Sequence, residues 1–348
     1  MLCILSFFVF AILGIFSASH RELAKKAWYC LVKKIQFKPC DINFNEELKG
    51  KMLGKLVFTH PRLGGFLYKW DDVLSVVFVI LSVWSLLAVV RSSVYLLAYD
   101  TCDPYSEEGC SLAGDSCTIN VASLSFIESI RTGTTLDWVT LRVTTFGDAI
   151  TRVPNRFKNW DPQAFLPANP SYYQPYDSAK PTALEIIDPS CKFCAELFKN
   201  IKESKAYERH NITYIAYPIP SGEKQRFPHS LLIARYLEAL KQYPLPNVTT
   251  PTDWQLLERV FTDQEQFNFV YDEPTALQTL REYLIDIGYT DEGVNSIHST
   301  AMSAIVTDAI AEHARIVEEQ IETIKIPTIL IGGRRFDRLI DTDKLNSL

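Results

Sequence analysis

Two cysteines separated by two residues, Cys191 and Cys194, follow closely on a short apolar run at residues 183–187. The pattern predicts a buried strand, a C-x-x-C turn and then a helix. This order suits a thiol–disulfide centre, because a helix N-terminus stabilises one thiol as its thiolate and the second thiol lies one helical turn further on. A later apolar run opens with Ile326-Pro327-Thr328. Together these features indicate an α/β fold around a candidate redox site.

Two other interpretations of the C-x-x-C remain open, a structural disulfide and a zinc site completed by distant ligands. Such a zinc site would need a second C-x-x-C or a pair of histidines. The six histidines are dispersed along the chain and form no such pair. We therefore expect neither a bound metal nor a cofactor.

Two uncharged apolar segments are each close to the ~20 residues that cross a bilayer. The first covers residues 1–19. No basic region precedes it, which favours an uncleaved span over a cleaved signal, although Ser17-Ala18-Ser19 leaves cleavage open. The second begins at Val73, is uncharged as far as Arg91, and extends to about residue 97. A buried core helix is the alternative, but the segment lacks any polar face.

Basic residues concentrate between these two segments, where eleven Lys and Arg fall between Arg21 and Lys69. Positive loops stay in the cytoplasm, so the loop at residues 20–72 is expected there and everything after the second span outside. The net charge of −6 gives no general attraction to nucleic acid. We expect a two-pass cell-membrane protein in contact with the lipid bilayer, with its C-x-x-C in an extracytoplasmic compartment that permits disulfides.

Residues 98–160 are expected to form an extracytoplasmic region beside the membrane. Three cysteines, Cys102, Cys110 and Cys117, lie in its first part, and residues 121–160 show helical periodicity. An odd number outside the membrane indicates one disulfide plus one thiol, or pairing with another chain. Zinc is an alternative, although no histidine accompanies them. Residues 161–181 are rich in Pro, Tyr and Asn and are expected to form a linker, whose last part around residues 172–176 is compatible with an edge strand.

The pattern changes at residue 182, where a domain that runs to residue 348 is expected to begin. A helix is expected at about 191–204, and an all-helical insertion occupies about residues 228–324. Strands are expected at 183–187, 212–217, 328–331 and 334–336, and helical stretches within the insertion at 229–240, 254–261, 275–287 and 302–324.

This order of elements resembles the DsbA-like branch of the thioredoxin superfamily over about residues 172–348; the N-terminal half resembles no family that we can name. The resemblance implies a thioredoxin fold with an inserted helical subdomain. It maps the family's C-x-x-C onto Cys191 and Cys194 and implies a Cys191–Cys194 disulfide. The family's acidic residue, six positions before the first cysteine, maps onto Glu185, and its cis-proline maps onto Pro327.

Two features depart from the family pattern. The residues between the cysteines are Lys192 and Phe193, where family oxidases often carry Pro-His, which leaves the redox direction open. The chain also has little room after the last strand for the expected C-terminal helix.

Each candidate residue has an expected role. Cys191 is the exposed nucleophile, favoured as a thiolate by the helix N-terminus and by the charge of Lys192. Cys194 is the more buried resolving thiol, and Glu185 relays its proton from a buried strand. A cis peptide bond at Pro327 exposes the backbone of Ile326 for pairing with a substrate. The residues expected to contact substrate are Ile326, Thr328, Lys192 and Phe193.

We therefore expect a membrane-tethered thiol–disulfide oxidoreductase that acts on cysteines of unfolded or exported proteins and exchanges electrons with a membrane redox partner. Oxidase or isomerase activity is favoured over reductase activity. A non-enzymatic tethered chaperone or assembly module with a thioredoxin fold is the alternative, as is a copper or zinc carrier that uses Cys191 and Cys194.

Overall fold

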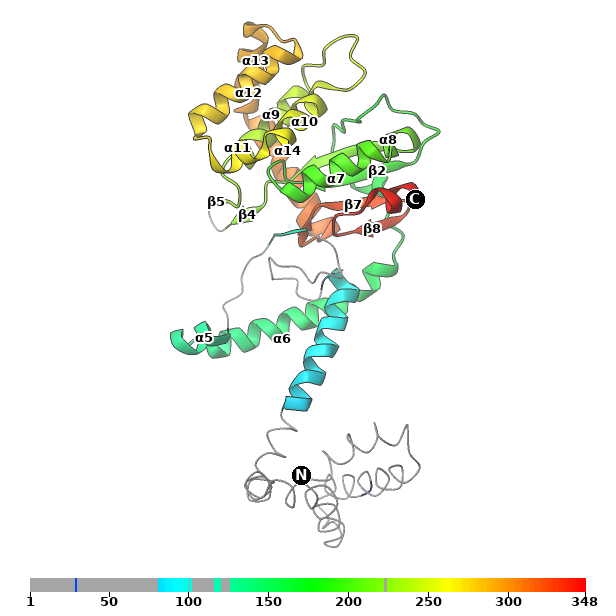
Figure 1. Cartoon of the computed structure of the whole chain (residues 1–348), viewed down its shortest axis with the longest axis vertical. Helices are drawn as coiled ribbons and strands as arrows, with labels where there is room; N and C mark the ends of the chain where they lie inside the picture. The colour runs from blue at the N-terminus through cyan, green and yellow to red at the C-terminus, as the bar shows by residue number, and fades with distance from the viewer. Residues whose placement is uncertain (1–28, 30–80, 100, 102–115, 120–125, 222–223) are drawn as a thin grey trace, which may run out of the picture. The chain divides into compact units, whose positions relative to one another are not determined.

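The computed structural model describes Tyr29 and residues 81–99, 101, 116–119, 126–221 and 224–348 (Figure 1). The chain divides into two compact units, residues 1–91 and residues 92–348. The expected first span at 1–19 lies outside the described residues, as does the basic loop at 20–72 apart from Tyr29.

One helix in the described residues, Leu81–Tyr99, is long and apolar enough to cross a membrane. It forms the second part of the predicted second span and continues two residues beyond the expected end at 97. Its apolar side chains, including Leu86 and Leu87, are largely exposed. Towards its C-terminal end the surface is covered, because Tyr95 and Tyr99 pack against Ala149 of α6 (Thr135–Arg152).

The described residues that follow helix Leu81–Tyr99 and precede the main sheet are mostly helical. Helix α5 (Phe126–Thr132) precedes α6, and two short 3-10 turns follow, η1 (Val153–Phe157) and η2 (Pro162–Phe165). The expected linker at 161–181 then joins the edge of the main sheet. Tyr172 bridges Thr213, and the Tyr173 amide donates a 2.9 Å hydrogen bond to the Ile212 carbonyl.

A four-stranded mixed sheet forms the centre of the second unit. Its strands are β2 (Thr182–Ile187), β3 (Asn211–Ala216), β7 (Thr328–Ile331) and β8 (Arg334–Phe336), in the order β3-β2-β7-β8. Strands β2 and β3 are parallel, whereas β7 runs antiparallel to both β2 and β8. Every residue of β2, β3 and β7 is buried, which explains why these strands are continuous apolar runs without polar alternation.

Helix α7 (Lys192–Glu203) covers one face of this sheet. Its apolar residues recur at helical spacing, so that Cys194, Leu197, Phe198 and Ile201 form one buried face. The short α8 (Ala206–Arg209) leads into β3. The expected shortage of a C-terminal helix is visible in α15 (Thr342–Asn346), a single turn that packs on α7 through buried Leu345.

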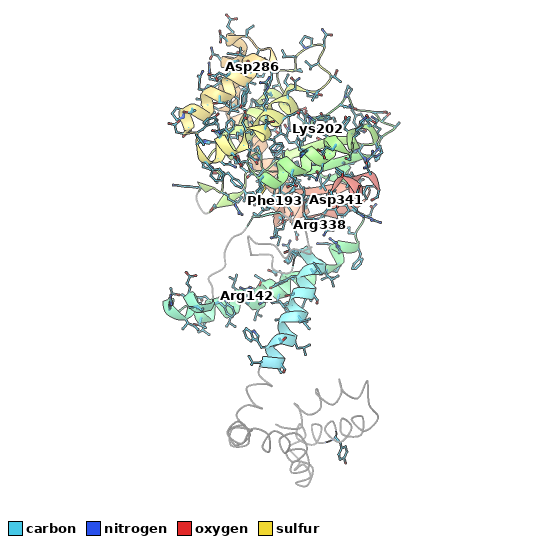
Figure 2. All side chains as sticks on the ribbon, viewed as in Figure 1. Arg142, Phe193, Lys202, Asp286, Arg338 and Asp341 are labelled. Carbon is cyan, nitrogen blue, oxygen red and sulfur yellow. A yellow bond between two sulfur atoms is a disulfide. The ribbon has the colours of Figure 1, made fainter. Side chains whose placement is uncertain are left out.

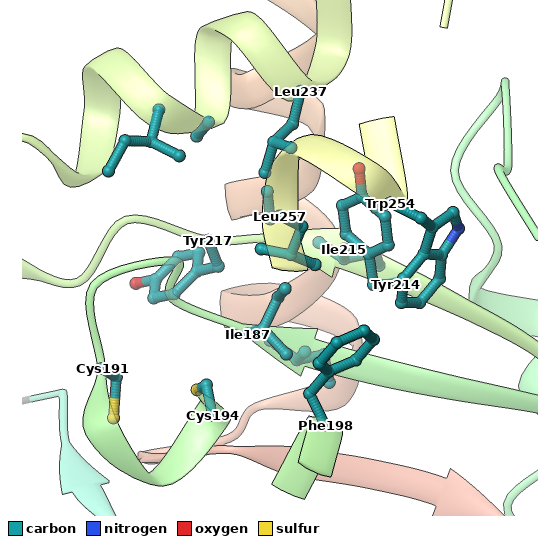
Figure 3. Packing of buried hydrophobic residues seen from close by; sticks show 14 of the residues in the cluster. Ile187, Cys191, Cys194, Phe198, Tyr214, Ile215, Tyr217, Leu237, Trp254 and Leu257 are labelled. Carbon is teal, nitrogen blue, oxygen red and sulfur yellow. The ribbon is translucent and has the colours of Figure 1, made fainter. Parts of the chain in front are cut away.

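The insertion between β3 and β6 (Lys325–Ile326) begins with a small hairpin of β4 (Pro220–Ser221) and β5 (Lys224–Gln225), and its described elements after this hairpin are helical (Figure 1). Trp254 of the insertion stacks on Phe198 of α7 and meets the ring of Tyr214 of β3 edge-on, which joins insertion and sheet into one core (Figure 3). The helices are α9 (Ser230–Leu240), α10 (Thr252–Thr262), α11 (Gln264–Phe269), α12 (Glu273–Ile287), α13 (Asp291–Ala301) and α14 (Ala304–Arg315).

The predicted bounds of the helix over residues 302–324 are wrong at both ends. Helix α14 starts at Ala304, because α13 ends at Met302 and the chain turns there. From Ile316 to Ile321 the helix widens into a π-helix, and it stops at Glu322, whose φ of 54° is left-handed. A left-handed residue cannot continue a right-handed helix. Helices α11 and α13 are elements that the apolar periodicity did not single out.

Candidate active site

The C-x-x-C motif lies where a buried strand passes into a helix. Cys191 is the N-cap of α7 and has an extended backbone, and its amide donates a 3.0 Å hydrogen bond to the Asp188 carbonyl. The Cys194 amide in turn donates a 2.9 Å bond to the Cys191 carbonyl. The first cysteine therefore stands at the positive end of the helix dipole and the second within its first turn, as predicted (Figure 3).

The peptide bond between Ile326 and Pro327 is cis. The carbonyl oxygen of Ile326 lies 3.9 Å from Sγ of Cys191, although the two residues are 135 positions apart. The structure thus brings together the two features that the sequence placed far from one another, the C-x-x-C and the Ile-Pro-Thr element.

The disulfide in the structure is not the expected one. Cys191 is bonded to Cys117, with the Cα atoms 6.8 Å apart, and Cys194 is a buried free thiol. The pairing of Cys117, which the sequence left open, is therefore with the motif itself. A Cys191–Cys194 bond remains a prediction for another redox state of the same site.

Strand β1 (Cys117–Thr118) explains why Cys191 is fully buried instead of exposed as expected. It pairs antiparallel with β6 (Lys325–Ile326), with Cys117 opposite Ile326 and Thr118 opposite Lys325. The backbone of Ile326, expected to be free for a substrate, is thus already paired with another segment of the chain.

Glu185 lies in the middle of β2 and is almost completely buried. The glutamate therefore does not lie on an exposed face of the strand. Its Oε1 has no hydrogen-bond partner among the described residues. Burial raises the pKa of this carboxyl to about 8, because the charged form has lost its hydration. The group can thus carry a proton near neutral pH, which its expected role as a relay requires.

The Cys194 thiol has a pKa well above its ordinary value, chiefly because burial disfavours the thiolate. The nearby carboxylates of Asp188 and Glu185 raise it further. Cys194 is therefore a protonated thiol at neutral pH and needs a base before it can attack a disulfide.

Asp188 is a residue whose importance the sequence analysis missed. Its carboxylate accepts hydrogen bonds from the Ile219 amide at 2.7 Å, the Ser190 amide at 2.8 Å and the Ser230 hydroxyl at 2.6 Å. Burial nevertheless raises its pKa to about 6, against the lowering effect of these bonds. An acid between an apolar strand and a Pro-Ser-Cys turn was the available signal.

Helix α11 holds the loop before Cys191 from the other side. The side-chain amides of Gln264 and Asn268 donate to the carbonyls of Pro189 and Ser190, at 3.2 and 2.9 Å. The helical insertion therefore fixes the backbone on which the nucleophile is mounted. These contacts join residues more than seventy positions apart, so no local pattern could indicate them.

Three side chains expected to contact substrate, those of Lys192, Phe193 and Thr328, differ in how exposed they are. Lys192 is exposed, and its ammonium lies 4.6 Å from the ring centre of half-buried Phe193 at the start of α7 (Figure 2). Thr328 is fully buried, and its hydroxyl is bonded to the Lys325 carbonyl and to Asp337 at 2.7 and 2.9 Å. The Thr328 side chain therefore stabilises the loop and does not face outwards.

The described residues contain no group of three or more His, Cys, Asp or Glu side chains placed to hold a metal ion. Within the part of the chain that is described, the candidate site gathers the three sulfur atoms, the Glu185 carboxyl and the Ile326 backbone.

Searches with the sequence find no matching family model and no matching curated protein. Solved structures similar to this chain are thiol–disulfide oxidoreductases or related proteins. A thioredoxin-like oxidoreductase from Silicibacter pomeroyi is 13% identical over 48% of this chain and 82% of its own, with a TM-score of 0.36. The thiol-disulfide exchange protein alpha-DsbA2 from Wolbachia pipientis is 17% identical over 51% and 84%, with a TM-score of 0.38. ScsC from Proteus mirabilis is 12% identical over 64% and 94%, with a TM-score of 0.39.

The assignment of the fold rests on the topology of the chain itself. The chain has a DsbA-like thioredoxin fold, because a parallel β2–α7–β3 unit, a helical insertion and the β7–β8 hairpin after a cis-proline occur in that order.

Proposed function

We propose that this chain is a membrane-anchored thiol–disulfide oxidoreductase that acts on cysteines of exported or unfolded proteins. One observation carries the proposal: Sγ of Cys191, at the N-terminus of α7, lies 3.9 Å from the carbonyl oxygen that precedes the cis-proline. A peptide paired with Ile326 would present its own cysteine to Cys191, as Cys117 does in the structure.

The proposed reaction uses the thiols of Cys191 and Cys194 and the carboxyl group of Glu185. In the oxidising direction, a substrate thiolate attacks Cys191 of a Cys191–Cys194 disulfide, and Cys194 leaves as the thiolate and takes a proton from Glu185. A second substrate thiolate attacks the substrate sulfur of the mixed disulfide and releases Cys191. The substrate loses two electrons and the enzyme gains them. In isomerisation Cys191 is released again without net electron transfer.

The proposal includes a membrane anchor. The exposed apolar helix Leu81–Tyr99 has the length of a span, and the basic loop that precedes it in sequence orients it by the positive-inside rule. The redox domain would then lie outside the cytoplasm, beside the lipid bilayer, where a membrane redox partner could reoxidise it.

The test uses the full chain in detergent and follows oxidation of reduced ribonuclease and reduction of insulin. Cys191→Ser should abolish both activities. Cys40→Ser, in the predicted cytoplasmic loop, is the matched control and should keep them. Absence of both activities in the Cys40→Ser protein and in the unaltered chain would overturn the enzymatic proposal.

The same preparations separate the two alternatives. A chaperone or assembly module would suppress aggregation of an unfolded protein equally well with Cys191→Ser. A copper or zinc carrier would bind about one metal ion per reduced chain and lose it with Cys191→Ser.

A further inference from the structure

Residues 116–119 lie where the proposed function places a substrate. The segment pairs with β6 through Cys117 and Thr118, and the pairing continues because the Ile119 amide donates a 2.9 Å hydrogen bond to the Ile324 carbonyl. Its cysteine is bonded to the first cysteine of the motif. The segment is thus an extended strand on the edge next to the cis-proline, with a covalent bond to the nucleophile.

Side chains alternate along this strand, so Cys117 and Ile119 share a face. Both are buried in the same apolar core as Cys191 and Ile326, with exposed fractions of 5% and 7%. The strand is therefore held at two points, by a sulfur and by an apolar side chain two residues later.

The Cys117–Cys191 bond differs from a disulfide that merely braces the fold. Among the described residues, strand β1 pairs only with the two-residue β6 and is not part of the four-stranded sheet. The bond also consumes the nucleophile and leaves Cys194 as a thiol. A mixed disulfide between enzyme and substrate has this same distribution of sulfur atoms.

We propose that Cys117 is a third redox cysteine of this site and that residues 116–119 are a built-in substrate mimic. The inference rests on the proposed function and names its substrate class: extended segments that carry a cysteine followed, two residues later, by an apolar side chain. Residues 116–119 hold the site in a resting state that must open before an external substrate binds.

Opening needs no external oxidant or reductant. The Cys194 thiol gives its proton to the Glu185 carboxylate, and the resulting thiolate attacks Sγ of Cys191. The Cys191–Cys194 bond forms while the Cys117–Cys191 bond breaks. Cys117 leaves as a thiolate and takes a proton from water. One disulfide is exchanged for another, and the edge of β6 becomes available.

The first experiment maps the disulfides of the full chain, purified in detergent without reductant and treated with iodoacetamide over time. Cys194→Ser cannot make the exchange and should retain Cys117–Cys191. In the unaltered chain Cys117 should become alkylated as Cys191–Cys194 forms, and Cys110→Ser, the matched control, should behave likewise. The inference falls if Cys194→Ser lacks the Cys117–Cys191 bond, or if Cys117 of the unaltered chain stays bonded throughout.

The second experiment measures substrate preference in a single exchange. The probe is the peptide Gly-Asp-Ser-Cys-Thr-Ile-Asn, identical to residues 114–120, with thionitrobenzoate on its cysteine as a coloured leaving group. The matched probe carries Ser in place of Ile. Reduced protein with both Cys117→Ser and Cys194→Ser should react about tenfold or more faster with the first probe, because Ile burial is lost in the second. Equal rates would overturn the substrate class.

Neither experiment requires turnover. A Cys117→Ser protein that neither oxidises ribonuclease nor reduces insulin contradicts the proposed function. Absence of exchange at Cys117, or of discrimination between the probes, contradicts only the present inference.

Discussion

Ser230 donates a 2.6 Å hydrogen bond to the carboxylate of Asp188, so that the first residue of the helical insertion's α9 is bonded to the loop that carries the redox motif. The same carboxylate receives the amides of Ile219 and Ser190. One buried side chain therefore joins the end of β2, the approach to Cys191 and the insertion.

Replacing Asp188 with Ala should lower the free energy of unfolding by about 3 kcal/mol, because three buried donors lose their acceptor. Pulse proteolysis of the full chain in detergent and urea would measure the loss. Asp272→Ala is the matched control, since that exposed aspartate is the N-cap of α12 and accepts a hydrogen bond from the Thr275 amide. A similar loss in both variants would show that the Asp188 network is not special.

Glu185→Gln should change how stability depends on pH. The pKa of Glu185 is about 8 in the folded protein and near 4.5 in the unfolded chain, so the unfolded chain releases this proton first as pH rises. Its contribution to stability is therefore greatest below pH 4.5 and declines up to about pH 8. The decline is on the order of several kcal/mol.

The Gln variant should lose this decline and be more stable than the unaltered chain at pH 8, as measured by urea unfolding at both pH values. Glu196→Gln, on the exposed side of α7, should leave the slope as it is. A Glu185→Gln protein with an unaltered slope would contradict the raised pKa.

The same substitution should slow resolution of a mixed disulfide. Burial keeps Cys194 as a thiol, so a proton must be removed before its sulfur can attack the mixed disulfide. Glu185 is the buried carboxyl group to which we assign this proton transfer. General-base assistance of this kind contributes about 100-fold or more to a rate. Quenched-flow measurement on Cys117→Ser, loaded with a peptide at Cys191, should show a loss of that size at pH 7 when Glu185→Gln is added. Equal resolution rates would assign the proton to another group.

A reporter enzyme that needs disulfides should be active when fused after Leu348 and inactive when fused after His60. The reason is the basic loop, which is expected to remain in the cytoplasm while the redox domain lies outside. Activity of both fusions, or of the His60 fusion alone, would reject the two-pass orientation.

Gly333→Ala should destabilise the protein by about 1–3 kcal/mol. Gly333 has a φ of +72°, and an added Cβ would overlap Oδ1 of Asn159. Its carbonyl also accepts the Trp160 amide at 2.9 Å. Gly147→Ala is the control, because that glycine is helical and its Cβ would meet no atom within 4 Å. Thermal unfolding should show no loss, or a gain, for the control.

Strands β2, β3 and β7 and the helix after Cys191 could be predicted because each is a local apolar pattern with clear ends. The short β8 was indicated instead by the Gly332-Gly333 turn that precedes it. The burial of Glu185 was not decided by the apolar run, because alternation along a strand also permits an exposed face; the family resemblance favoured burial, and the structure shows it. Helix α13 was missed because Ser, Thr, Asn and Gly interrupt its apolar spacing.

The partner of Cys191 could not be predicted in this way. Strand β1 is two residues long, and its cysteine lies 74 positions from Cys191. So short a strand has no periodicity, and its place is decided by a long-range pairing with β6. The hydrogen-bond network around Asp188 could not be predicted for a similar reason, because its donors come from three separate segments.

The shortness of β6 has a consequence for solubility. An unpaired strand edge can template pairing with other chains and lead to aggregation. Here the edge that β1 covers is only Lys325–Ile326, and Pro327, which follows directly, has no amide to donate. A stretch of two residues closed by a proline offers too few hydrogen bonds to hold a second copy of the domain. The protein can thus expose this edge to an incoming peptide without aggregating with other copies of itself through the same edge.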